Sequence, residues 1–135
     1  AGEVSFPGWR LEVRDEDPVS TALREAEEEL SIKSTDVHIL GQLTPLFIPD
    51  SNFLVYPILG YVKKRPRFMG SESEVAEILE LRIKDLLNPQ NLRQVPMRLG
   101  SGLQIEVPSF EIASPPIWGA TAMILNELLE ILRKQ

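Results

Sequence analysis

The stretch that decides the fold is residues 17–30, DPVSTALREAEEEL, where apolar residues recur at helical spacing between two clear end signals. Asp17 suits the N-cap of a helix, and Pro18 suits the first helical position. The apolar stripe consists of Val19, Ala22, Leu23, Ala26 and Leu30. We therefore predict an amphipathic helix that begins after Asp17 and runs to about Leu30.

The opposite face of this helix is acidic. Glu25 and Glu29 are one helical turn apart, and Glu28 lies beside them. Arg24 precedes Glu28 by four residues, so these two side chains can form an ion pair. Carboxylates at this density suit a hard cation such as Mg²⁺ or Mn²⁺. Acidic helix faces are more often simply solvated, so the helix alone leaves both interpretations open.

Outward from the helix, the pattern predicts one mixed α/β domain spanning residues 1–135, with helices packed on a sheet. Strands are expected at residues 4–6, 37–43, 53–62, 75–83 and within 103–112, and a second long helix at 118–133 headed by a buried Trp118. Pro7 and Gly8 end the first strand, and a polar loop comes next. That strand needs partners, either later in the chain or in an N-terminal segment absent from this sequence.

Composition excludes several classes of protein. The chain has 135 residues, of which 43% are hydrophobic and 25% are charged, as in an ordinary globular domain. It has no Cys and one His, which argues against disulfides, thiolate chemistry and a multi-histidine zinc site. The net charge of −6 disfavours diffuse nucleic-acid binding. No membrane-spanning or signal segment is visible, so we expect a cytoplasmic protein, and a homodimer is left open.

The segment GEVSFPGWRLEVRDEDPVSTALREAEEELSI, residues 2–32, resembles the Nudix box in the form found in coenzyme A pyrophosphatases. The residues in register are Val4, Phe6, Pro7, Gly8, Glu12, Asp15, Thr21, Ala22, Arg24, Glu25, Glu28, Glu29 and Leu30. Later segments also resemble that subfamily, so the likeness covers nearly the whole chain. It implies a Nudix fold, an α/β (α+β) domain in which a mixed β-sheet is sandwiched between helices.

The resemblance also implies an activity. Such enzymes would use Mg²⁺ or Mn²⁺ to split a nucleoside diphosphate derivative, here coenzyme A or a relative of it, into 3′,5′-ADP and a 4′-phosphopantetheine product. Glu25, Glu28 and Glu29 would hold the metal, and Arg24 would orient their carboxylates. Glu28 or Glu74 would accept the proton of the attacking water. The residues that the likeness places near the substrate are Gly8, Trp9 and Arg10.

Two positions depart from the family pattern. Trp9 stands where the family has a second glycine, and Ser31 stands where it has a glycine after the helix. Within the enzyme class, the alternative is a different Nudix specificity, such as ADP-ribose or a nucleoside triphosphate. A Nudix-fold binding module that has lost catalysis is another, although the intact REAEEE run argues against it.

Overall fold

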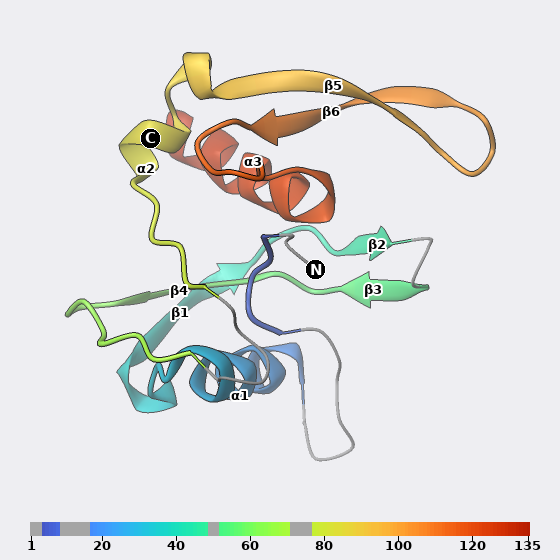
Figure 1. Ribbon diagram of the computed structural model, residues 1–135. Coiled ribbons are helices and arrows are strands. Elements are labelled where there is room, and N and C mark those ends of the chain that lie inside the picture. Colours follow the sequence, from blue (N-terminus) through green and yellow to red (C-terminus); the bar gives the residue numbers. More distant parts are fainter. Residues whose placement is uncertain (1–3, 9–16, 49–51, 71–76) are drawn as a thin grey trace. The chain divides into compact units, whose positions relative to one another are not determined.

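The computed structural model describes residues 4–8, 17–48, 52–70 and 77–135 (Figure 1). The chain forms two compact units. The central unit is Phe6–Glu80, and the terminal unit combines Ala1–Ser5 with Leu81–Gln135. That residues 1–135 act as one domain stays a prediction, and each unit is described by itself.

The predicted helix of the central unit is confirmed as α1 (Pro18–Leu30). The side chain of Asp17 accepts a hydrogen bond from the Ser20 N–H at 2.7 Å, so Asp17 is the N-cap and Pro18 opens the helix. The helix ends at Ser31, which adopts the left-handed conformation at φ 61°. Both ends are thus where the sequence pattern places them.

After the short 3₁₀ turn η1 (Ser34–Asp36), the central unit continues as one long, interrupted hairpin (Figure 1). Its strands are β1 (Val37–Gln42), β2 (Leu46–Ile48), β3 (Phe53–Val55) and β4 (Ile58–Val62). β1 pairs with β4 and β2 with β3, both antiparallel. Leu40 bulges out of the first pair, and the Leu43 N–H donates to the Pro57 carbonyl at 2.9 Å where the ladder is interrupted. The hairpin is held together across this interruption.

The strand predicted at residues 53–62 is found as two shorter strands rather than one. The segment divides into β3 and β4 because Pro57 has no N–H to give to a ladder. Tyr61 on β4 is 45% exposed and stacks on His38 of β1, with ring centroids 4.9 Å apart. At Gly60 the strands approach so closely that a Cβ would lie 2.8 Å from Val37 Cγ1, which explains the glycine there.

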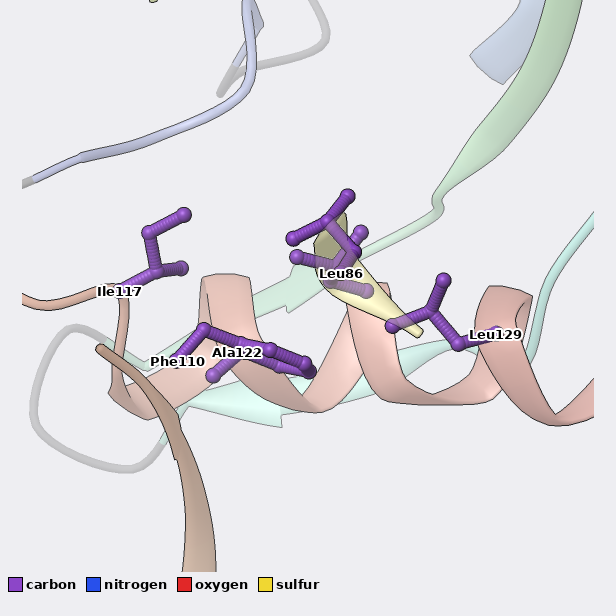
Figure 2. Packing of buried hydrophobic residues seen from close by; sticks show 6 residues of the cluster. Leu86, Phe110, Ile117, Ala122 and Leu129 are labelled. Carbon is purple, nitrogen blue, oxygen red and sulfur yellow. The ribbon is translucent and has the colours of Figure 1, made fainter. Parts of the chain in front are cut away.

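The terminal unit packs one helix on a hairpin. Its elements are α2 (Ile83–Leu86), η2 (Pro89–Asn91), β5 (Leu92–Arg98), β6 (Gln104–Phe110) and α3 (Gly119–Arg133). β5 and β6 pair antiparallel over their whole length. Buried apolar side chains from α2, β6, α3 and the segment between β6 and α3 meet in one core (Figure 2), made of Leu86, Phe110, Ile117, Ala122, Leu125 and Leu129.

Several other sequence predictions fail here. Residues 4–6 form no strand, and the Val4 carbonyl instead accepts a hydrogen bond from Thr121 Oγ1 at 2.9 Å. Residues 77–82, the described part of the strand predicted at 75–83, have no ladder partner either. Trp118 is not in the core but is the N-cap residue of α3, 47% exposed. β5 is absent from the sequence prediction; its Pro96 lies opposite Glu106 of β6 in the antiparallel pair.

The predicted α/β class is confirmed. The described strands form three separate two-stranded antiparallel sheets, interrupted at irregular segments rather than joined into one ladder. Within the part of the chain that the structure describes, no helix has the length and apolar character needed to cross a membrane.

Candidate functional site

The acidic face of α1 is organised by Arg24. Its Nη1 atom lies 2.9 Å from Glu25 Oε1 and 3.1 Å from Glu28 Oε2. The Arg24 and Glu25 side chains are 13% and 15% exposed, while that of Glu28 is 46% exposed. The predicted Arg24–Glu28 pair is therefore confirmed, and Arg24 also holds Glu25. One guanidinium between two carboxylates reduces the repulsion that their spacing would otherwise cause.

Gly8 brings backbone against this face. Its φ of 107° is a conformation that side chains rarely adopt, and a Cβ built there would lie 3.7 Å from Glu25 Cβ. The described end of the predicted substrate loop thus lies against a predicted metal ligand. Only glycine adopts this conformation without strain, which explains why the Nudix-like pattern has a glycine at position 8.

The last turn of α1 is fixed on two sides. Ser31 Oγ donates to the Met69 carbonyl at 3.0 Å, and the Met69 N–H donates to the Leu30 carbonyl at 3.2 Å. On another side, the Ser34 N–H and hydroxyl both donate to Glu27 Oε1, at 2.9 and 3.1 Å. These bonds lower the pKa of the Glu27 carboxyl below its ordinary value. The bond from the Ser34 N–H has the larger effect, and the bond from the hydroxyl the next largest.

Sequence reasoning missed Glu27 and the partner of Ser31. The signal for Glu27 was present, because Ser34 comes seven residues later at the start of a 3₁₀ turn, where its N–H needs an acceptor. No local signal could have found Met69, which is 38 residues from Ser31.

The fit of a divalent cation can be judged from the donor chemistry. Glu25 and Glu28 reach a common cationic atom on one helix face, and carboxylate oxygen is the donor that Mg²⁺ and Mn²⁺ prefer. Glu29 comes next in the same turn of the helix. Among the described residues, however, no group of three His, Asp or Glu side chains gathers closely enough to hold an ion. The donors fit in kind, and Glu25, Glu28 and Glu29 as joint ligands stay a prediction.

Several predicted site residues lie outside the described residues. Trp9 and Arg10 of the substrate loop and Glu74, a candidate general base, are among them, as are Glu12 and Asp15 of the Nudix-like pattern. Their assigned roles stay predictions.

The basic run at residues 63–67 has the composition of a solvated loop, and the structure places its charged side chains on the surface. Arg65 in this run grips Glu80 with two hydrogen bonds, Nε to Oε1 at 2.9 Å and Nη2 to Oε2 at 2.8 Å. The two hydrogen bonds to Glu80 raise the pKa of Arg65, and they link residues 65 and 80 within the central unit.

Comparison with known proteins gives the family. The NUDIX domain model matches residues 1–98. A protein of Yersinia enterocolitica named "Uncharacterized Nudix hydrolase NudL" is 39% identical over 130 residues, which cover 96% of this chain and 66% of that protein. Proteins of the same name from Yersinia pestis and Yersinia pseudotuberculosis are 37% identical over 131 residues, 96% of this chain and 64% of each.

The chain therefore spans just under two thirds of the length of these relatives. The family match, in contrast, covers well over half of the chain and includes the whole of α1 with its glutamates. The chain belongs to the Nudix family.

Proposed function

We propose that this protein is a metal-dependent Nudix hydrolase that cleaves the pyrophosphate bond of coenzyme A or its derivatives, giving 3′,5′-ADP and 4′-phosphopantetheine. The observation that carries the enzymatic part is the placement of Arg24 between the carboxylates of Glu25 and Glu28 on one face of α1. The coenzyme A part rests on the resemblance of residues 2–32 to that subfamily's box. The name Nudix hydrolase on the relatives supports the reaction class.

The roles of the side chains are argued from their placement. A bound Mg²⁺ or Mn²⁺ would screen the pyrophosphate charge and lower the pKa of the attacking water. Glu25 and Glu29 are its principal ligands in this proposal. In this proposal Arg24 orients the carboxylates and Glu28 accepts a proton from water. The greater exposure of the Glu28 side chain, 46% against 15% for Glu25, supports that role. Glu74 is the alternative acceptor.

Substrate contacts are proposed for the loop that begins at Gly8. The Gly8 backbone lies against Glu25, so a diphosphate held by the metal would also face this backbone. Trp9 and Arg10 come directly after it in sequence and complete the proposed contact. The partner is thus a small nucleoside diphosphate derivative. A cytoplasmic location remains a prediction from sequence, and homodimer formation remains open.

A hydrolysis panel tests the proposal. The chain, and the same chain extended to the full length of its relatives, would be incubated with coenzyme A, ADP-ribose and a nucleoside triphosphate, each with Mg²⁺ and with Mn²⁺. Release of 3′,5′-ADP from coenzyme A, abolished by EDTA, is the expected result. Faster cleavage of another substrate would replace the coenzyme A assignment. Tight ligand binding without hydrolysis of any diphosphate would identify a binding module instead.

A further inference from the structure

The C-terminal end of α1 has a serine, Ser31, in a backbone conformation that is unfavourable for any residue with a Cβ. Ser31 closes the helix at φ 61°, and its N–H donates to the Glu27 carbonyl at 3.0 Å. Glycine is the usual residue at such a left-handed position, because a Cβ there crowds the following carbonyl. A compensating interaction of the serine side chain would explain why it is tolerated.

That interaction is present in the hydroxyl group. Ser31 Oγ donates to the Met69 carbonyl at 3.0 Å, while the Met69 N–H donates to the Leu30 carbonyl at 3.2 Å. The Leu30 carbonyl is one of those that the end of a helix leaves without an intrahelical partner. Leu30 and Ser31 at the helix end thus bond both the N–H and the carbonyl of Met69. Of these two hydrogen bonds, only the one from Ser31 depends on a side chain.

This tether acts on the turn that carries the predicted metal ligands. Glu28 and Glu29 immediately precede Leu30 and Ser31. Terminal turns of helices fray unless their backbone groups are bonded, and fraying would spread the positions of both carboxylates. Ligands held by bonded neighbours bind metal more tightly than ligands that must first be ordered.

We propose that Ser31 is a positioning residue, whose hydroxyl anchors the last turn of α1 to Met69 and so holds the Glu28 and Glu29 carboxylates ready for a divalent cation. The inference rests on the proposed function, because it assumes that these glutamates bind metal. It gives the Ser31 hydroxyl a role that glycine, which has no side chain, could not fulfil. Glycine would nevertheless adopt the left-handed conformation at this position with less strain.

Three substitutions separate positioning from stability. Ser31→Gly removes the hydroxyl and also the conformational strain, so its melting temperature should equal or exceed that of the wild type. Ser31→Ala removes the hydroxyl and keeps the strain, so it should melt lower. Both should bind Mn²⁺ about 10-fold more weakly in calorimetry, the scale found for lost partners of metal ligands. Ser31→Thr keeps a hydroxyl, so it should retain most of the affinity while melting lower.

Kinetics and hydrogen exchange complete the test. With saturating metal, the Gly and Ala variants should recover most of their kcat, because the metal then orders the turn itself. In the metal-free protein, both should lose exchange protection at the Met69 amide. A Gly variant with wild-type Mn²⁺ affinity, or metal binding that tracks the melting temperatures, would overturn the proposal. Wild-type protection at Met69 without any Mn²⁺ binding would instead show that the tether exists and that the proposed function has failed.

Discussion

At the scale of single residues, Arg24 decides how the acidic face behaves without metal. Its Nη1 atom serves Glu25 and Glu28 together, so the two carboxylates are held near each other in the folded chain. A site that is already assembled loses less entropy on binding a cation than one assembled by it. The two ion pairs of Arg24 therefore stabilise the acidic face in the metal-free chain.

Glu29→Gln tests the metal face directly. Gln keeps the size and helix propensity of Glu, so the metal-free protein should still fold and melt cooperatively. A neutral amide is a poorer ligand for a hard cation, so kcat for coenzyme A hydrolysis should fall by about 10²-fold or more. Steady-state kinetics and thermal melts measure both effects.

The matched control for this variant is Glu130→Gln on α3, which breaks only an exposed pair with Arg133 at 3.0 Å. Its activity should stay near that of the wild type. A folded Glu29→Gln protein with most of its activity would remove Glu29 from the site.

Gly8→Ala tests the approach of the loop backbone to Glu25. The alanine would occupy φ 107°, which costs about 1–2 kcal/mol of stability, and its Cβ would contact the Glu25 side chain. Both the free energy of unfolding and the Mn²⁺ affinity should therefore fall. Gly102→Ala is a matched control, because Gly102 has φ 89° with nothing within 4 Å of its Cβ. The Gly102→Ala variant should lose similar stability in urea titrations yet bind Mn²⁺ with the wild-type affinity. Equal Mn²⁺ affinities of the two variants would show that the approach of Gly8 to Glu25 does not affect metal binding.

At the scale of elements, α1 is tied at its C-terminal end to two later segments of the central unit. Ser34 of η1 donates twice to Glu27, and Met69 bonds to the helix end. The helix has a single buried side chain, Thr21, so packing alone gives it little support within the described residues. Caps and tethers must supply much of its stability.

The Glu27–Ser34 contact predicts a pH dependence. The hydrogen bonds from Ser34 lower the folded-state pKa of Glu27. They therefore stabilise the fold at pH values above the unfolded-state pKa of about 4.3. This stabilisation is lost as the pH falls through the folded-state pKa. Glu27→Gln should therefore melt lower than the wild type at pH 7, and the gap should close below about pH 4. Melts of Glu27→Gln in a Ser34→Ala background give the control. A gap that is constant from acid to neutral pH would contradict this account.

At the scale of the whole molecule, the central and terminal units are stabilised by different interactions. The terminal unit has a contiguous apolar core in which Phe110 and Leu129 are fully buried (Figure 2). The described part of the central unit consists mainly of the interrupted hairpin and α1, and its Arg65–Glu80 ion pair is solvent-exposed and contributes little stability. The Nudix match ends at residue 98, inside the terminal unit, so the family pattern runs across both units.

Leu129→Ala tests this core. Removing a fully buried leucine side chain costs its transfer free energy and leaves a cavity, so the free energy of unfolding should fall by about 2–5 kcal/mol. Ile131→Ala two residues away on α3 is the control, because Ile131 is 42% exposed and its truncation should cost far less. Urea titrations of both variants measure the difference, and equal losses would show that the buried cluster is not what stabilises this unit.

The sequence by itself determined those features whose causes are local. The bounds of α1, the Asp17 cap, the Arg24–Glu28 pair and the extent of α3 are all set by helical periodicity and by residues within four positions of one another. The segment of residues 2–32, loop and helix together, also indicated the Nudix family, which the family match confirmed. In each case the signal lies in residues that are near one another in the sequence.

Only the tertiary structure decided the features that depend on partners far along the chain. β5, which contains Pro96, is a strand because β6 pairs with it along its whole length. Trp118 is apolar by type, but it occupies the N-cap position of α3 and is 47% exposed. The bond from Ser31 to Met69 joins residues 38 apart in sequence. Periodicity and propensity describe a residue's neighbours along the chain, whereas pairing and burial are set by its neighbours in space.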